Sequence, residues 1–367
     1  MTEKEAYIII NMIPGIGTIR IQELISAFGS PKNLLNASHS DLKSQYGINK
    51  KTADNILAWQ EKTNIAKELE LASMADVKII TLADKEYPES LKQIYNPPLC
   101  LYVRGNLPQD TSMNIAMVGS RRTTRYGLKV TAHIAAAAAD AGWRVISGLA
   151  YGIDSAAHKT VVEKKGETIA VLGGGLARIH PQDHIPLANN IVKLNGAVIT
   201  EFPMEFPPTR WSFPLRNRII SGLSNGLIVI EAGERSGSLI TAKFALEQGR
   251  TIFAVPGEID NPQAKGTNTL IKNGAKLTET FDDILEEFSF LPSYAVKEDK
   301  KPKSKIKLNN TEEKIISELH KGSMSTDQIA IALSIQPGPL LATLMQMQIK
   351  GLIAPLPGKK YELKKQL

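Results

Sequence analysis

The sequence predicts an α/β protein with an extended Rossmann-like, doubly wound sheet at its centre. Between residues 114 and 257, short apolar stretches alternate with helical segments of about ten to sixteen residues, the pattern of parallel strands joined by helical crossovers. The stretches are rich in Val and Ile throughout, so both faces of the sheet are expected to be covered. Most of them run directly into a cluster of Gly, Ser or Arg. Such clusters meet at the carboxyl edge of a parallel sheet, so we expect a phosphate-binding crevice there.

The first 75 residues predict a small helical domain. The phrase IPGIG at 13–17 precedes an apolar-periodic helix over 19–28, and a weaker echo, YGINKK at 46–51, precedes a helix over 52–59. A Gly-x-Gly turn between two helices lets backbone amides approach a phosphate, as in a helix-hairpin-helix (SAM-like) module that grips the DNA backbone. A turn that serves only for packing is the alternative, and the sequence leaves both open.

The sheet domain is expected over residues 76–290. Residues 77–105 predict two short strands around a Pro-rich turn, which lead into the repeated units. The repeated strands that follow are expected at 115–118, 144–147, 168–172, 197–200, 226–230 and 251–255.

The C-terminal part predicts a basic linker and a winged helix. Residues 291–310 contain six lysines and only scattered apolar side chains, with almost nothing to bury, as a linker does. Residues 311–367 follow with three short helices, at 312–319, 326–333 and 338–350, and two strands around a turn. The third helix carries no Arg or Lys before Lys350, so contact with duplex DNA and contact with protein both stay open.

Composition narrows the class of protein. The chain has 367 residues, of which 43% are hydrophobic, and a net charge of +7, which favours a polyanionic partner. The single cysteine, Cys100, excludes an intrachain disulfide. No apolar run approaches the ~20 residues that cross a bilayer, and no cleavable leader is recognisable, so a cytoplasmic protein without membrane contact is expected.

The predicted crevice gathers groups that bind anions. Gly119 lets the chain approach a phosphate, while Ser120, the amides of the helix that follows and Arg121 can donate to it. The same chemistry recurs at residues 213–220, which place two arginines, Arg216 and Arg218, beside Asn217 near the start of another helix. It recurs again where Arg235, Ser236, Gly237 and Ser238 open a further helix, with Lys243 one turn on.

Several other sites are disfavoured. A dinucleotide site needs Gly-x-Gly-x-x-Gly and an acid for the ribose, and a Walker loop needs Gly-Lys-Ser or Gly-Lys-Thr; the sequence has none of these. Ser236 and Ser238 lack the nucleophile-elbow spacing. His180 and His184 stand among prolines without further metal ligands and are expected to be loop residues.

Long motifs along the central region closely resemble the DNA-processing protein A family, also called DprA or Smf. They are GSR at 119–121, SGLAYGIDSAAH at 147–158, FPLRNRIISGLS at 213–224, EAGERSGSLITA at 231–242, PG at 256–257 and GTNTLI at 266–271. The helical N-terminal domain and the winged helix agree with this resemblance in kind.

The resemblance implies a DNA-binding protein rather than an enzyme, and it implies no cofactor. Such a protein binds single-stranded DNA in natural transformation, protects it and hands it to the recombinase RecA. It commonly forms a homodimer through the Rossmann-like domain. By motif, the DNA-binding residues would be Gly119, Ser120, Arg121, Gly148, Asn217, Arg218, Ser236, Gly237, Ser238 and Lys243.

One segment departs from the family pattern. Where some members place a lysine after Tyr-Pro, this chain has His180-Pro181-Gln182, so Arg178 is expected to supply the missing cation. Stacking on bases is open between Tyr151, Trp211 and Phe213.

An enzyme is the alternative. Phosphoribohydrolases of the lysine-decarboxylase-like group resemble the chain at its glycine-rich turn, but their motif Pro-Gly-Gly-x-Gly-Thr-x-x-Glu ends in a catalytic acid. Here Thr241 stands in that place, which removes the obvious general acid/base.

Overall fold

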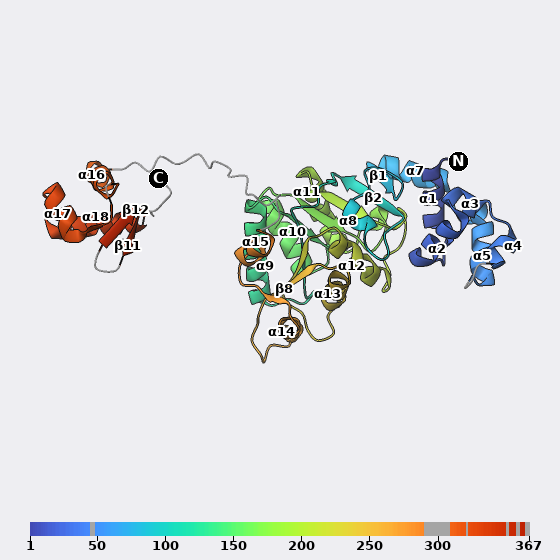
Figure 1. The fold of residues 1–367 in the computed structure, drawn as a ribbon. Helices are drawn as coiled ribbons and strands as arrows, with labels where there is room; N and C mark the ends of the chain where they lie inside the picture. Colours follow the sequence, from blue (N-terminus) through green and yellow to red (C-terminus); the bar gives the residue numbers. More distant parts are fainter. Residues whose placement is uncertain (45–47, 290–308, 321, 350–351, 357–359, 364–367) are drawn as a thin grey trace. The chain divides into compact units, whose positions relative to one another are not determined.

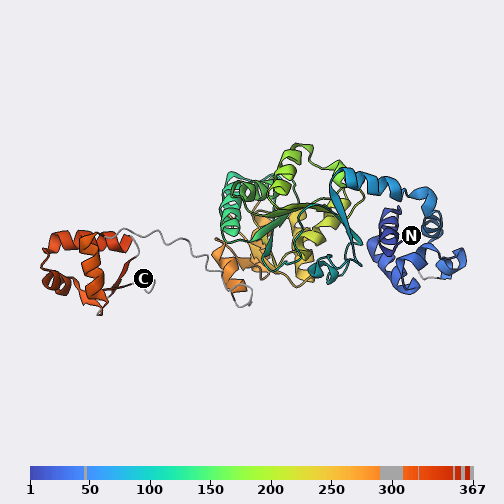
Figure 2. The ribbon, with the colours of Figure 1, turned by 90° about the horizontal axis from the view of Figure 1, so that it is seen from above.

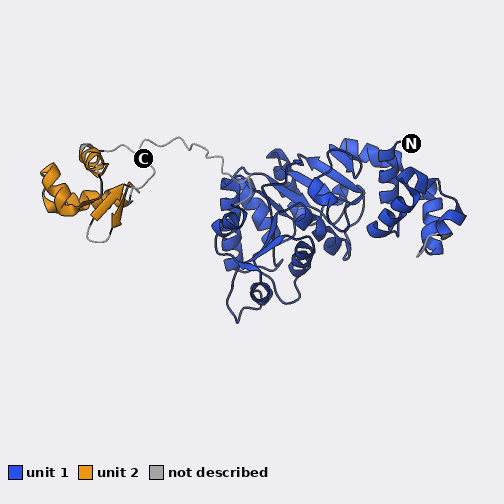
Figure 3. Ribbon diagram, viewed as in Figure 1, with its two compact units in different colours: residues 1–295 blue, residues 296–367 orange. Residues whose placement is uncertain are grey.

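The computed structural model describes residues 1–44, 48–289, 309–320, 322–349, 352–356 and 360–363. The chain forms two compact units, residues 1–295 and 296–367 (Figure 3). The expected linker at 291–310 lies outside the described residues except for its last two positions. The first two residues of the expected echo at 46–51 also lie outside them.

A nine-stranded sheet organises the first unit, in the order β1-β2-β6-β5-β4-β3-β7-β8-β9 (Figure 1). The seven strands from β6 to β9 are parallel, whereas β2 pairs antiparallel with both β6 and β1. The strands are β1 Val77–Thr81, β2 Cys100–Gly105, β3 Asn114–Val118, β4 Arg144–Ser147, β5 Thr168–Val171, β6 Ala197–Thr200, β7 Gly226–Val229, β8 Thr251–Ala254 and β9 Lys276–Leu277. The predicted doubly wound sheet is therefore confirmed.

Helices cover both faces of this sheet (Figures 1 and 2). Alternate residues of one strand enter different cores: Ile115 and Met117 pack with α9, α10 and α15, while Ala116 and Val118 pack with α8, α12 and α13. This alternation explains why the strands are apolar throughout. The helices are α8 Glu89–Lys92, α9 Arg125–Asp140, α10 Ile153–Glu163, α11 Ile185–Lys193, α12 Ser212–Gly222, α13 Gly237–Glu247, α14 Lys265–Lys272 and α15 Asp282–Phe288, with 3-10 turns η1 Leu176–Arg178 and η2 Gln182–His184.

The chain order of the strands reverses at β3. Its neighbours are β4, the next strand along the chain, and β7, which follows more than a hundred residues later. The crossovers from β3 therefore leave in opposite directions and open a crevice at the carboxyl ends of β3 and β7, the usual ligand position in such sheets.

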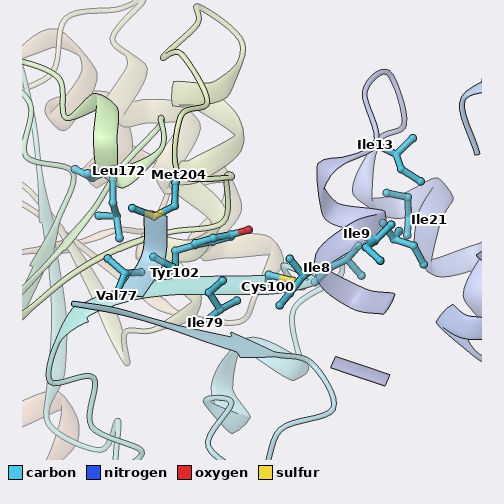
Figure 4. Close-up of a cluster of buried hydrophobic side chains, with 14 of the residues drawn as sticks. Ile8, Ile9, Ile13, Ile21, Val77, Ile79, Cys100, Tyr102, Leu172 and Met204 are labelled. Atoms are coloured by element: carbon cyan, nitrogen blue, oxygen red, sulfur yellow. The ribbon is translucent and has the colours of Figure 1, made fainter. Parts of the chain in front are cut away.

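The N-terminal helices share a core with the sheet. Ile8 and Ile9 of α1 belong to one buried cluster with Cys100 and Tyr102 of β2 and with Met204 (Figure 4). The helices are α1 Glu3–Met12, α2 Thr18–Phe28, α3 Pro31–Leu35, α4 His39–Ser44, α5 Lys50–Leu57, α6 Trp59–Lys62 and α7 Ile65–Met74. DNA contact by the Gly-x-Gly turn between α1 and α2 stays a prediction.

Two hydrogen bonds fasten these helices to the segment after β6. The Nδ2 of Asn11 in α1 donates to the Glu201 carbonyl (2.9 Å), and the buried carboxylate of Glu68 in α7 accepts from the Met204 amide (2.7 Å). This segment leads directly into α12, so the helices hold the polypeptide on which part of the crevice is built.

The second unit is a winged helix. It consists of α16 Asn310–Leu319, β10 Met324–Ser325, α17 Thr326–Leu333, α18 Pro337–Ile349, β11 Ile353–Leu356 and β12 Lys360–Leu363. The strands form an antiparallel sheet in the order β10-β12-β11, and Ile315, Leu340 and Ile353 lie in its core. In the part of the chain that the structure describes, no single helix has the length and apolar content to cross a bilayer; only α17 and α18 together, bent by 113°, meet that test.

His158 makes the first unit sensitive to acid. The Thr168 hydroxyl donates to the Val145 carbonyl (2.5 Å) and accepts from His158 Nδ1 (2.7 Å). The proton that would charge the imidazole would therefore have to bind to Nε2, which is buried without a partner among the described residues. Burial lowers the pKa of His158 to about 3.

The unfolded chain binds this proton near pH 6.5, so stability should fall as pH drops from about 6.5 toward 3. At pH 4.5 we expect wild type to have lost about 2–3 kcal/mol more free energy of unfolding than His158→Leu, relative to pH 7. Urea unfolding at both pH values measures this. The exposed His133→Gln should behave as wild type, and an equal acid loss in His158→Leu would contradict the assignment.

Candidate nucleic-acid interface

A cleft of about 620 Å³ opens where β3 and β7 end. Its walls come from five segments that are distant in the sequence: the loop after β3, the start of α10, the start of α12, the start of α13 and the loop before α14. The lining includes the arginines 121, 122, 210, 216 and 235, and a single carboxylate, Asp154. The geometry places the predicted phosphate-binding elements around one hollow.

The loop after β3 is held tightly against the sheet. A Cβ on Gly119 would lie 2.5 Å from Ile153 Cγ1, so only glycine fits there. The Ser120 amide donates to the Glu231 carbonyl (2.8 Å), and the Ser120 hydroxyl accepts from the Arg122 amide (3.1 Å). These contacts leave the side chains of Arg121 and Arg122 exposed at the rim of the cleft.

Four arginines line the cleft with exposed side chains and no bound carboxylate: Arg121, Arg122, Arg210 and Arg235. Within the described ranges, the arginines that do form ion pairs are Arg20, Arg144 and Arg218. Cations that converge on one concave surface focus a positive potential there. The cleft is therefore suited to a ligand that carries several negative charges.

Arg216 places a buried cation at the cleft floor. Its side chain is 3% exposed, and Nη1 donates to the carbonyls of Gly148 (2.9 Å) and Val171. Burial lowers the pKa of Arg216 to about 10, so the guanidinium keeps its charge at neutral pH. Burial also raises the pKa of Asp154, against the attraction of Arg216.

The start of α13 presents hydrogen-bond donors to the same cleft. Ser236 caps the helix, and its hydroxyl lies 2.7 Å from that of Ser238. The first turn carries no acidic residue, and no atom lies within 4 Å of where a Cβ on Gly237 would stand. A positive helix end that is free of carboxylates and open to solvent favours an anion.

Seven of the predicted site residues line the cleft, as expected: Gly119, Ser120, Arg121, Asn217, Ser236, Gly237 and Ser238. Three others lie outside the lining. The Gly148 amide donates to Asp154 (3.1 Å), and the Gly148 carbonyl accepts from Arg216. Arg178 is exposed on η1, and Lys243 points to solvent 3.8 Å from Glu247.

The position of Arg218 is the clearest departure from the sequence prediction. It is 3% exposed, and its two terminal nitrogens each lie 2.6 Å from an oxygen of Glu201, while Nε donates to the Asn96 carbonyl (2.8 Å). Every polar atom of its guanidinium is thus committed to the protein interior. Arg218 fixes α12 in place and does not line the cleft.

The helix amides after the first loop are a second correction. They were expected to donate to a bound phosphate, but the Thr124 amide at the start of α9 donates to the Glu231 carboxylate (2.9 Å). The groups of the cleft that stay available to an anion are therefore its exposed arginines and the start of α13.

Arg122 and Arg210 line the cleft but were not among the predicted site residues. Arg216 and Arg235 also line it; they were expected at the crevice as members of its basic clusters but were absent from the residues that the motifs imply. Arg216 and Arg218 are two residues apart on one helix and so project about 200° apart. The sequence showed both arginines but gave no signal for which of them faced the crevice.

Phe213 is the aromatic residue that lines the cleft. The Arg121 guanidinium lies 5.3 Å from its ring centroid, and the His180 ring lies at 5.9 Å. His180, which lies in the segment that departs from the family pattern, therefore contacts the Phe213 ring. Trp211 and Tyr151 are exposed but lie outside the lining, and the Tyr151 hydroxyl donates to Asp183 (2.8 Å).

Comparison with known proteins gives two family matches. The sequence profile of DNA recombination-mediator protein A matches residues 78–289, and that of the DprA winged helix domain matches residues 299–359. The DNA processing protein DprA of Bacillus subtilis is 44% identical over 212 residues, which cover 58% of this chain and 71% of the relative. Protein Smf of Escherichia coli is 42% identical over 255 residues, covering 69% and 68%.

Two solved structures are also similar. DNA processing protein A from Streptococcus pneumoniae superposes with a TM-score of 0.67 and 31% identity, over 79% of this chain and 99% of the other. DNA processing protein A from Helicobacter pylori superposes with a TM-score of 0.52 and 27% identity, over 59% and 97%; that structure is described as revealing a single-stranded DNA binding mode.

The buried ion pair between Arg218 and Glu201 yields a prediction about stability. Arg218→Met should lower the free energy of unfolding by about 3–5 kcal/mol, because it leaves the Glu201 carboxylate buried and unpaired. Adding Glu201→Leu should restore most of that loss. Urea denaturation measures both.

A partly exposed pair serves as the control: Arg144→Met, which loses the contact to Glu167, should cost about 1 kcal/mol or less. The structural role of Arg218 would be wrong if its substitution cost no more than this control.

Proposed function

Because the chain belongs to the DNA recombination-mediator protein A (DprA/Smf) family, we propose that it binds single-stranded DNA in the cleft, protects it and loads the recombinase RecA onto it in natural transformation. In this proposal it acts in the cytoplasm as a DNA-binding protein without a cofactor. In the same proposal the helical segment 1–75 and the sheet domain 76–290, which share a core, act as one body, and the basic linker joins them to the winged helix 311–367.

One observation carries the proposal: unpaired guanidinium groups and an open helix start surround a single cleft. A sugar-phosphate chain supplies the repeated negative charge that this arrangement favours. The lining offers cations, hydroxyls and one ring, Phe213, rather than a set of base-reading side chains. Binding should therefore depend on the backbone and vary little with base sequence.

A homodimer through the Rossmann-like domain is the second part of the proposal. Large apolar side chains are exposed on α13 (Leu246), in the loop after β8 (Ile259, 92% exposed) and on β9 (Leu277). Exposed apolar side chains of this kind can contribute to an interface. Family membership supports the RecA step.

A phosphoribohydrolase-like enzyme is the alternative, and one observation favours it. Asp154 is a buried carboxylate in the cleft lining with a raised pKa, a feature that also marks general acids. Incubation with nucleoside monophosphates tests this reading. Release of free base by wild type but not by Asp154→Asn would establish the enzyme; we expect no release.

The DNA-binding proposal is tested by a salt titration of oligonucleotide affinity. We expect tighter binding of single strands than of duplex. Arg121→Ala should weaken single-strand binding about tenfold, since it removes a charge-assisted phosphate contact. It should also reduce the slope of log affinity against log salt by about 0.7, the value for one phosphate contact on a single strand.

Lys193→Ala is the matched control, because Lys193 is exposed at the C-terminal end of α11 and lies outside the cleft lining. It should leave both affinity and slope near wild type. Equal affinity for single strand and duplex, or an Arg121→Ala variant that matches this control, would contradict the proposal.

A further inference from the structure

Glu231 places a buried carboxylate beside the carboxyl ends of β3 and β7, where the strand order of the sheet reverses. This place is called the switch point of the sheet. Glu231 lies two residues past the end of β7, with 2% of its surface exposed. Its two oxygens accept hydrogen bonds from the Thr123 hydroxyl (2.7 Å), the Thr124 amide (2.9 Å) and the Thr124 hydroxyl (2.5 Å). All three donors stand at the start of α9.

This position is where a doubly wound sheet usually binds phosphate. The helix after the first parallel strand points its positive end at the switch point, and free amides there attract an anion. In this chain the anion is supplied by the protein itself. Thr124 caps α9, and the Glu231 carboxylate fills the space in front of it.

Gly127 makes that close approach possible. It lies in the first turn of α9, where a Cβ would stand 2.3 Å from Glu231 Oε2 and 2.4 Å from Thr123 Oγ1. Any other residue would displace the carboxylate. The close packing of the Glu231 carboxylate against Gly127 is therefore a specific feature of the fold rather than an incidental contact.

The helix on the other side of the cleft has no such carboxylate. The first turn of α13 carries no acid, and Ser236, Gly237 and Ser238 line the cleft. One of the two helix starts at the switch point is thus filled, and the other is open.

We propose that Glu231 is a specificity-determining residue that occupies the anion position at the start of α9. It excludes a free phosphate or a dinucleotide pyrophosphate from that position and confines the phosphates of a ligand to the α13 side of the cleft. The inference rests on the proposed function only for the identity of that ligand as single-stranded DNA.

The test uses the full chain, inorganic phosphate as the probe and thermal unfolding of the first unit as the readout. Glu231→Ala empties the position and leaves its three donors free. Glu231→Gln keeps it filled, because the amide oxygen can accept from the Thr124 amide and the Thr123 hydroxyl, and the Thr124 hydroxyl can accept from the amide nitrogen. Saturating oligodeoxythymidine is added to occupy the cleft, and chloride keeps ionic strength constant.

Between zero and about 20 mM phosphate, the melting temperature of Glu231→Ala should rise by about 4 °C more than that of wild type or Glu231→Gln. An equal rise in all three proteins would overturn the inference. Oligonucleotide binding is measured on the same samples: a wild type that fails to bind would count against the proposed function, whereas the phosphate response reports on Glu231 alone.

Gly127→Ala provides a test that does not require the alanine variant at position 231 to fold. Replacing a helical glycine by alanine ordinarily raises stability. Here the new Cβ would overlap the Glu231 carboxylate, so the melting temperature should fall by several degrees. A rise would show that the carboxylate is not held as described and would overturn the inference.

Discussion

Mutual repulsion among guanidinium groups is the constraint on which this site depends. Five arginines line one cleft with a single carboxylate among them, and Arg121 is near enough to Arg216 to lower its pKa further. The fold holds these charges in place, and a polyanionic ligand would relieve their repulsion. A chain of phosphates relieves it at several points at once, which a lone anion cannot do.

The fold holds the charges through buried polar contacts beneath the cleft. Arg218 and Glu201 fix α12, so Arg216 on the same helix stays at the cleft floor. Glu201 is also bound through its carbonyl by Asn11 of the N-terminal helices, and Met204 is bound by Glu68. The helical N-terminal segment therefore stabilises the polypeptide that carries Arg210 and Phe213, whatever else it contacts.

Much of the fold could be predicted from the sequence, because each strand is an apolar run that ends at a small or polar residue. Both ends of β4 and β6 and the whole of α17 were placed correctly. The site was harder to predict. Neighbouring helical positions differ in direction, so Arg216 and Arg218 were both expected at the crevice and only Arg216 lines it. Glu231 follows an apolar run directly, and Gly127 stands in a helix; each is unusual alone, and only the structure shows that they meet.

The most direct test of the central claim is a structure of the full chain bound to a short oligodeoxythymidine. Consecutive phosphates should lie within hydrogen-bond distance of the Arg121 and Arg216 side chains and of the amides at the start of α13. The Glu231 carboxylate should still contact Thr124. A strand bound elsewhere on the protein, or one whose phosphates displace Glu231 from α9, would contradict this view of the site.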